Sequence, residues 1–215
     1  MRILAITDLH GNYSKIIPLL QKSGEIDLVL IAGDLTNFGP DEKAEKLIDM
    51  FESPVLAIPG NCDPKSLLDV LERRDINLHN SSRTIGDVTF IGLGGSNPTP
   101  FNTPFELEED EIESNLETLI NEAEKTDNVS VLLTHAPPHC TLDEVPAGNV
   151  GCRSIAKFMD RMDLIVCGHI HEARGVMEFG KSIVVNPGMG SDGYGALIDI
   201  NVDETPKIDV QLIKA

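Results

Sequence analysis

The stretch Arg2-Ile3-Leu4-Ala5-Ile6-Thr7-Asp8-Leu9-His10 opens the chain and joins a short apolar run to two side chains that can bind metal. The run from Arg2 to Thr7 reads as a buried β-strand, and Asp8 and His10 follow it directly. A carboxylate and an imidazole at a strand end suit a divalent ion. Taken alone, Asp8 could equally cap a helix that begins near Tyr13.

The same arrangement recurs at four further strand ends. The later motifs are Gly33-Asp34, Gly60-Asn61-Cys62-Asp63, Thr134-His135 and Gly168-His169-Ile170-His171. In an extended segment the side chains of His169 and His171 point the same way, which makes this motif the sharpest of the five. Each motif alone is weak and could be an ordinary turn, but five in order have no comparable structural explanation. Since open α/β sheets bind ligands at the carboxyl ends of their strands, we expect five loops from one sheet edge to meet at one point.

The motifs supply a set of oxygen and nitrogen ligands: Asp8, His10, Asp34, Asn61, His135, His169 and His171. Seven ligands are too many for one tetrahedral ion, but they suit two ions that share a carboxylate. Carboxylates mixed with imidazoles favour manganese, iron, nickel or zinc over a thiolate-bound metal, and we place manganese first. The sequence therefore predicts a two-metal centre.

Short apolar strands alternate with amphipathic helices over the first two thirds of the chain, and a strand-only segment follows. The predicted helices are Tyr13–Lys22, Asp41–Phe51, Pro64–Asp75, Leu107–Lys125 and Cys152–Arg161. The predicted strands are Arg2–Thr7, Leu28–Ala32, Val55–Ile58, Val88–Leu93, Val129–Leu133, Leu164–Val166, Val176–Phe179, Ile183–Val185, Ala196–Ile200 and Ile208–Ile213. This order predicts one α/β domain, residues 1–215, with two mixed β-sheets packed face to face and helices outside.

The chain is strongly acidic, with 35 acidic and 17 basic residues and a formal net charge of −18. Such a surface repels nucleic acids and anionic membranes. The first apolar run is broken by Asp8, and no stretch approaches the roughly 20 apolar residues of a membrane helix. We therefore expect a cytoplasmic protein with mostly reduced cysteines, while a Cys140–Cys152 bridge stays an open alternative.

The order DxH, GD, GNxD, H and GHxH resembles that of the calcineurin-like metallophosphoesterase superfamily, from Met1 to about Asp192. The stretches Thr134–Pro138, Gly168–Glu172 and Val185–Gly188 look like its small prokaryotic branch, often called Icc-like or cyclic-nucleotide-phosphodiesterase-like. The resemblance implies a four-layer αββα sandwich. It also implies hydrolysis of a phosphodiester or an activated phosphomonoester, in a small molecule, by a hydroxide that bridges two metal ions.

The resemblance also assigns roles to single residues. It gives one metal to Asp8, His10 and His171 and the other to Asn61, His135 and His169, with Asp34 bridging the two. Asp63 is expected to orient the ligands, because imidazole ligands usually need such a partner. The stretch from Asn186 to Gly188 is expected to shape a loop beside the metals.

The pattern departs from that of many family members at Cys62, where they carry a histidine thought to protonate the leaving group or hold the phosphate. A thiol with a pKa of about 8.5 is a poor substitute. His139 is the alternative proton donor if its loop folds back, although its position favours a surface loop residue over that role. We therefore expect substrates with good leaving groups.

Two other functions compete with the phosphoesterase. A nuclease is disfavoured by the net charge of −18 and by the lack of a Lys/Arg cluster near the motifs. A catalytically silent interaction scaffold, as in the retromer subunit that resembles this family, is disfavoured because all seven ligand positions are filled. A homodimer through an exposed sheet edge is a further open expectation.

Overall fold

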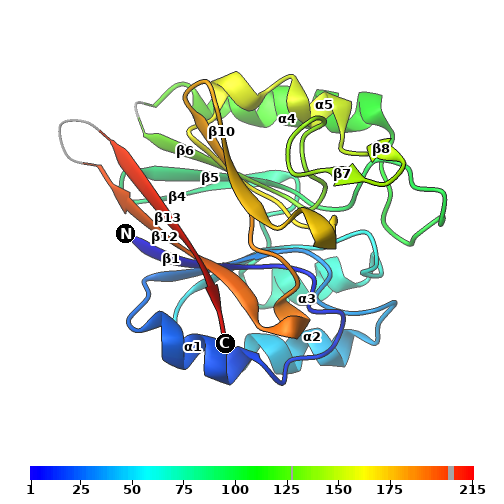
Figure 1. The fold of residues 1–215 in the computed structure, drawn as a ribbon, viewed down its shortest axis with the longest axis vertical. Coiled ribbons are helices and arrows are strands. Elements are labelled where there is room, and N and C mark those ends of the chain that lie inside the picture. The colour runs from blue at the N-terminus through cyan, green and yellow to red at the C-terminus, as the bar shows by residue number, and fades with distance from the viewer. Residues whose placement is uncertain (127, 203–205) are drawn as a thin grey trace.

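Two β-sheets packed face to face form the centre of the molecule, and helices cover both outer faces (Figure 1). The computed structural model describes residues 1–126, 128–202 and 206–215. The first sheet has the order β13-β12-β1-β2-β3. Its strands are β1 (Arg2–Ile6), β2 (Leu28–Ala32), β3 (Val55–Ile58), β12 (Tyr194–Asn201) and β13 (Lys207–Lys214). β1, β2 and β3 run parallel, while β12 and β13 complete the sheet with antiparallel pairing.

The second sheet has the order β10-β11-β9-β6-β5-β4. Its strands are β4 (Ser81–Ile85), β5 (Val88–Leu93), β6 (Val129–Thr134), β9 (Leu164–Val166), β10 (Gly175–Phe179) and β11 (Ser182–Asn186). The four inner strands are parallel, and the edge strands β4 and β10 are antiparallel to their neighbours. A small hairpin, β7 (Glu144–Val145) with β8 (Gly148–Asn149), stands apart from both sheets.

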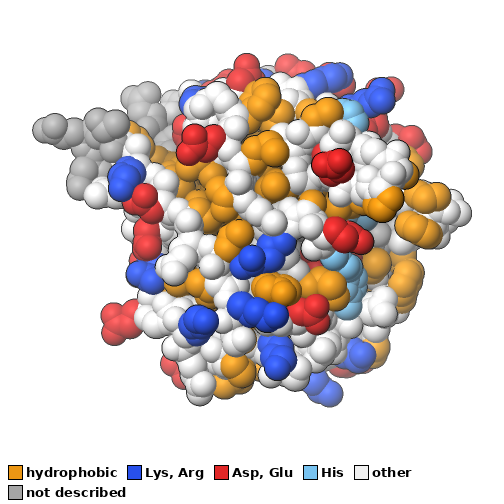
Figure 2. Space-filling model, viewed as in Figure 1, with side chains coloured by type: hydrophobic (Ala, Val, Ile, Leu, Met, Phe, Trp, Pro, Cys, Tyr) orange, Lys and Arg blue, Asp and Glu red, His pale blue; other side chains and the backbone are white. Residues whose placement is uncertain are grey.

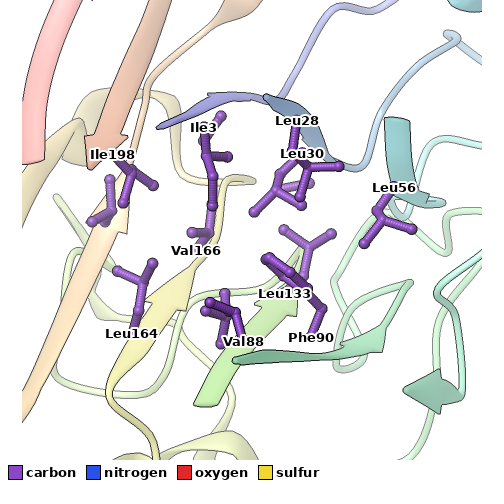
Figure 3. Packing of buried hydrophobic residues seen from close by; sticks show 14 of the residues in the cluster. Ile3, Leu28, Leu30, Leu56, Val88, Phe90, Leu133, Leu164, Val166 and Ile198 are labelled. Carbon is purple, nitrogen blue, oxygen red and sulfur yellow. The ribbon is translucent and has the colours of Figure 1, made fainter. Parts of the chain in front are cut away.

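The core has three apolar layers, because alternate side chains of each central strand point to opposite faces of its sheet. Between the sheets, Ile3 and Leu30 of the first sheet face Phe90 and Val166 of the second (Figure 3). All four side chains are completely buried. The strands are therefore apolar on both faces, which explains why they read as continuous hydrophobic runs rather than as alternating patterns.

Helices form the two outer layers. α1 (Ile16–Ser23), α2 (Asp41–Ile48) and α3 (Leu67–Arg73) cover the first sheet, while α4 (Glu109–Ala123) and α5 (Arg153–Ala156) cover the second. The predicted apolar stripe of α4 is buried at Ile112, Leu116 and Ile120. The predicted αββα sandwich with two mixed sheets is thus confirmed.

The differences from the predicted elements lie at ends and edges. The helix predicted over Cys152–Arg161 is split into α5 and a 3₁₀ turn, η1 (Met159–Arg161). β4 and the β7–β8 hairpin were not predicted, since β4 is a largely polar edge strand and the hairpin strands have only two residues each. The four cysteines are free thiols, so Cys140 and Cys152 are not bridged in this structure. Among the described helices, none has the length and apolar run needed to cross a bilayer.

Candidate metal centre

All the predicted ligand residues lie just beyond the carboxyl ends of five parallel strands, but these strands belong to two sheets. Asp8, Asp34 and Asn61 follow β1, β2 and β3 of the first sheet. His135 follows β6, and the Gly168–His171 motif follows β9 of the second sheet. The expectation that one sheet edge supplies all five loops is therefore wrong. The packed sheets place the carboxyl ends of their parallel strands on the same side of the molecule, so the centre forms between the two edges.

Asp8, His10 and His171 form the first group of ligand atoms. Nε2 of His171 lies 3.3 Å from Oδ1 of Asp8 and 3.2 Å from Nε2 of His10, while Nε2 of His10 lies 3.9 Å from the same Asp8 oxygen. Asp8 is almost fully buried, whereas the two histidines reach the surface. Figure 2 shows histidine side chains emerging at one edge of the molecule, between its upper and lower halves.

Asp34, Asn61 and His135 form the second group, with His169 beside it. Nε2 of His135 lies 2.9 Å from Oδ1 of Asn61 and 3.4 Å from Oδ2 of Asp34. The rings of His135 and His169 meet edge to face with their centroids 5.1 Å apart. Asp34 also faces the first group, because its Oδ2 lies 3.7 Å from Nδ1 of His10. One carboxylate thus stands between the two groups of ligands.

The second group places lone pairs opposite one another. Nδ1 of His135 lies 2.8 Å from the carbonyl oxygen of Ala32, so Nδ1 carries the proton and Nε2 is the free nitrogen of the neutral ring. Oδ1 of Asn61 is also an acceptor, because the amide nitrogen Nδ2 donates to Thr103. When His135 is neutral, two acceptors and a carboxylate converge with no proton between them, which is the donor set a cation requires. The residues therefore fit the two-metal centre that the sequence predicts.

Four of the ligand residues have backbone conformations that L-amino acids rarely adopt. Asp8, His10, Asp34 and His169 have positive φ angles of 53°, 46°, 51° and 68°. Such residues cost free energy and persist only where the surrounding structure enforces them, which is typical of functional sites. The strain supports a site in which the direction of each ligand matters more than local stability.

Two of the motif glycines are required by close packing of the loops. A Cβ atom on Gly60 would lie 2.1 Å from Oδ1 of Asp34, and one on Gly168 would lie 2.7 Å from Oδ2 of Asp8. Each of these glycines therefore lets a backbone segment approach a ligand carboxylate that comes from another strand.

Asp63 orients the ligand loops, but through the backbone rather than through an imidazole. Its two oxygens accept hydrogen bonds from the amides of Leu35, Thr36 and Gly60 and from the hydroxyl of Thr36, at 2.7–3.0 Å. These donors lie next to Asp34 and Asn61, so one buried carboxylate ties together the loops after β2 and β3. The expected imidazole contact is absent among the described hydrogen bonds of Asp63, and the partner of His135 is instead the carbonyl of Ala32.

Three further residues hold the ligands in place, two of which the sequence did not indicate. Thr103 accepts from Nδ2 of Asn61 and donates to Glu106, across the loop between β5 and α4. No motif marks this pair, since it lies about 40 residues from Asn61 in the chain. The third, Asn186, donates to the carbonyl of Ile170 and accepts from the amide of Gly188, while its expected role in shaping a loop beside the metals stays a prediction.

The charges of the centre favour a bound cation. Burial alone would raise the pKa values of Asp8 and Asp34, but the neighbouring histidines outweigh it and hold both below their ordinary range. Burial would likewise lower the pKa of His135, but the adjacent Asp34 carboxylate raises it to about 9. Burial and the nearby His135 together lower the pKa of His169 to about 4. The two ionised carboxylates thus favour one positive charge at this point, supplied either by a second proton on His135 or by a cation that replaces that proton, while His169 keeps its lone pair.

The two candidate proton donors have different positions. Cys62 belongs to the centre, because its Sγ lies within 4.8 Å of ligand atoms of both His10 and Asp34. Burial and the Asp34 carboxylate raise the pKa of this thiol well above its usual value, so it stays protonated and is a weak acid. His139 instead faces Asp143, with Nδ1 3.5 Å from Oδ2, and its amide donates to the carbonyl of Cys152. Among the contacts of the described residues, none joins His139 to the ligand set.

This fold and this set of converging ligands define a metallophosphoesterase, and comparisons with known proteins agree. The chain belongs to the calcineurin-like phosphoesterase family, whose sequence model matches residues 1–173. It is 39% identical over 200 residues to the uncharacterized protein MJ1162 of Methanocaldococcus jannaschii, covering 87% of this chain and 88% of that protein. The family predicted from the sequence motifs is thereby confirmed.

Solved structures show that the fold is shared more widely. The protein TT1561 of Thermus thermophilus superposes with a TM-score of 0.71 at 19% identity, over 97% of each chain. A dimetal phosphatase from Danio rerio superposes with a TM-score of 0.66 at 10% identity, over 100% of this chain and 98% of that one. At these identities the likeness establishes the architecture alone.

Proposed function

We propose that this protein is a phosphoesterase that uses two divalent ions, manganese first among them, and that it hydrolyses phosphodiesters in preference to phosphomonoesters. The observation that carries the proposal is the convergence of His135 Nε2, Asn61 Oδ1 and Asp34 Oδ2, three atoms that all offer lone pairs to a cation when His135 is neutral. Membership of the calcineurin-like phosphoesterase family supports the same chemistry.

The ligand groups suggest how two ions would be shared. Asp8, His10 and His171 would hold one ion, and Asn61, His135 and His169 would hold the other. Asp34 would serve both, since its Oδ2 faces His10 at 3.7 Å and His135 at 3.4 Å. Divalent ions bound there would lower the pKa of a water molecule and offset negative charge on a phosphoryl group.

The chain's own residues restrict which leaving groups can depart. A poor leaving group needs a proton donor, and general acids typically contribute 10²–10⁴-fold to such reactions. The raised pKa of Cys62 makes it a weak acid, and His139 is turned to Asp143. We therefore propose that the natural substrate has a stable leaving group, such as an aryl alcohol or an activated phosphodiester alcohol.

The preference for diesters rests on charge. A diester carries one negative charge near neutral pH, whereas a monoester carries up to two. In the described part of the chain, Asp8 and Asp34 form ion pairs with histidines and with neither lysine nor arginine. In that part of the chain, no lysine or arginine is therefore paired with these two carboxylates. The second negative charge of a monoester would have no such side chain to balance it.

Hydrolysis of bis-p-nitrophenyl phosphate and of p-nitrophenyl phosphate tests the proposal. Protein stripped of metal would be resupplied with manganese, nickel, zinc or magnesium, in wild type, Asp34→Ala and the control Asp69→Ala on the exposed face of α3. We expect metal-dependent turnover of the diester to exceed that of the monoester in wild type and in Asp69→Ala, and to vanish in Asp34→Ala.

Metal binding is measured separately by thermal unfolding. A ligand at 100 times its dissociation constant stabilises a protein by about 2.7 kcal/mol, which for a chain of this size raises the melting temperature by about 5–10 °C. We expect this rise on adding manganese to wild type and its loss in Asp34→Ala. A clear rise without turnover of either ester would favour a metal-binding scaffold over an enzyme.

A further inference from the structure

Phe38 and Phe101 are the most exposed of the large hydrophobic side chains in the described residues, at 62% and 80%. The chain has seven phenylalanines and no tryptophan, so aromatic side chains are scarce. Single exposed hydrophobic residues are common and need no explanation by themselves. These two are of interest because both lie on loops that are hydrogen-bonded to residues of the metal centre.

The backbone of Phe38 is linked to the ligand Asp34 through one intermediate residue, Cys62. Its amide donates to the carbonyl oxygen of Cys62 over 2.9 Å, and the amide of Cys62 donates to Oδ1 of Asp34 over 2.8 Å. The backbone that carries the Phe38 ring is therefore fixed to the loop that faces both ligand groups.

Phe101 lies on the loop between β5 and α4, and this loop is hydrogen-bonded to Asn61. Thr103, two residues away, accepts a hydrogen bond from Nδ2 of Asn61 over 3.0 Å, and the amide of Phe105 donates to the Asn61 carbonyl over 3.1 Å. The two exposed rings thus sit on separate loops that are hydrogen-bonded to the consecutive residues Asn61 and Cys62. Figure 2 shows hydrophobic side chains exposed on the same edge of the molecule as the histidines.

The backbone at Phe38 adds a second observation. Its φ angle is 57°, a left-handed conformation that is unfavourable for a bulky residue and natural for glycine. The amide of the following Gly39 donates to Oγ1 of Thr36, which in turn donates to Asp63, so the surrounding loop enforces the conformation. Backbone strain of this kind is typical of functional sites, and the Phe38 ring is 62% exposed to solvent rather than packed in the core.

We propose that Phe38 and Phe101 form an aromatic subsite that binds the planar ring of an ester group, either an aryl ring or a nucleobase, while the phosphate lies at the metal centre. This inference rests on the proposed function and specifies its substrate class. Apolar rings stack on exposed aromatic side chains with little loss of conformational freedom, so such a subsite selects ring-bearing esters over alkyl esters.

Calorimetric binding of phenylphosphonate and methylphosphonate to the manganese-loaded protein tests the subsite without relying on turnover. The two ligands share the phosphonate group and differ in the ring. We expect wild type to bind phenylphosphonate about fivefold more tightly. The preference should fall below about twofold in Phe38→Ala and in Phe101→Ala. Phe179→Ala, which removes an exposed phenylalanine from β10, is the matched control and should keep it.

Phe38→Gly provides a second variant, since glycine removes the ring and also accepts the positive φ angle. An adenosine phosphonate separates the two sources of the ring: loss of its affinity together with that of phenylphosphonate supports a nucleobase, and loss confined to phenylphosphonate supports a simple aryl ring. An equal affinity of wild type for phenyl and methyl ligands would overturn the subsite, as would an unchanged preference in both alanine variants. If either result accompanied metal-dependent diester hydrolysis, the subsite would be wrong and the phosphoesterase would stand. Loss of the preference in the variants without any ester turnover would retain the subsite and overturn the enzymatic function.

Discussion

Nδ2 of Asn61 donates a hydrogen bond to Oγ1 of Thr103 over 3.0 Å, and this contact determines which end of the Asn61 amide faces the metal centre. The hydroxyl of Thr103 uses its single proton on Oε1 of Glu106, at 2.6 Å, so toward Asn61 it can only accept. Burial alone would raise the pKa of Glu106, but hydrogen bonds from Thr103 and Thr99 lower it and keep the acceptor ionised. The two hydrogen bonds, from Asn61 to Thr103 and from Thr103 to Glu106, therefore keep Oδ1 of Asn61 turned toward His135.

Replacing Thr103 with valine should weaken metal binding without unfolding the protein. Valine keeps the shape of threonine but removes the acceptor, so the Asn61 amide is free to rotate and present Nδ2 to the cation. Loss of a group that orients a metal ligand typically costs 10–100-fold in affinity, and we expect about this loss for one of two manganese ions by calorimetry. Thr118→Val, on the exposed surface of α4, is the control. Equal affinity of both variants for both ions would contradict the role of Thr103.

Asp63→Asn should cost both stability and metal affinity. Each oxygen of Asp63 accepts two hydrogen bonds. In asparagine an NH₂ group replaces one of these oxygens, so its N–H bonds would face two other donors and leave buried donor groups without an acceptor. Each such group costs about 1–3 kcal/mol, so we expect a loss of about 3 kcal/mol in the free energy of unfolding, measured by urea denaturation. Manganese affinity should fall as well, because the loops carrying Asp34 and Asn61 lose their common anchor.

Asp163→Asn is the matched comparison for this variant. Asp163 also accepts hydrogen bonds from a backbone amide and a hydroxyl, those of Ser130, but the residues lie at the opposite ends of β6 and β9 from the metal ligands. We expect Asp163→Asn to lower stability while manganese affinity stays within about twofold of wild type. Similar losses of affinity in both variants would show that general destabilisation, rather than loop anchoring, weakens the centre.

The sequence was sufficient to predict the layers, and also which polar side chains meet at one site, because both depend on short-range signals. Buried parallel strands are apolar on both faces, as in Leu28–Ala32, and a polar residue such as Asp34 directly after such a strand is conspicuous. The αββα arrangement follows once helices such as α4 show a single apolar stripe. The predicted roles of the seven ligands remain predictions, although the structure brings their side chains together.

Other features depend on contacts that no local pattern encodes. The hydrogen bond from Asn61 to Thr103 joins two residues that lie 42 positions apart in the chain, and the sequence around Thr103 has the composition of an ordinary turn-rich loop. The positive φ angles of Asp8 and His10 arise because backbone hydrogen bonds from residues 8–10 to the loop after β2 fix the chain there. The supply of ligands by two sheets, instead of one, depends on how the sheets pack, which strand order alone does not specify.

His79 should make the protein less stable in mild acid. Its Nδ1 accepts a hydrogen bond from the amide of Gly94, and burial, together with nearby Lys65, lowers its pKa to about 4. The unfolded chain, with a histidine pKa of about 6.5, then binds more protons than the folded one between pH 4 and 6.5, so stability falls as the pH drops through this range. Through His79 alone, the free energy of unfolding should be about 2 kcal/mol lower at pH 5 than at pH 7.5.

His79→Asn isolates this contribution, since the asparagine oxygen can accept from Gly94 and does not titrate. Urea denaturation in excess chelator, at pH 7.5 and at pH 5, should show a smaller acid loss in the variant than in wild type. Because the other histidines are common to both proteins, they cancel in the difference. An acid loss of the same size in both would show that His79 is protonated in the folded protein or contributes nothing to the pH dependence.

Cys62→His should restore a proton donor and change which esters are hydrolysed fastest. The thiol lies among ligand atoms of His10 and Asp34, so an imidazole there would reach a departing oxygen. We expect hydrolysis of diphenyl phosphate, which has a poor leaving group, to rise about tenfold or more, whereas bis-p-nitrophenyl phosphate, which needs no proton, changes little. The gain should also disappear at high pH, where the new imidazole loses its proton. Cys140→His, at an exposed loop cysteine, is the control, and an equal response of both esters to Cys62→His would mean that protonation of the leaving group does not limit this enzyme.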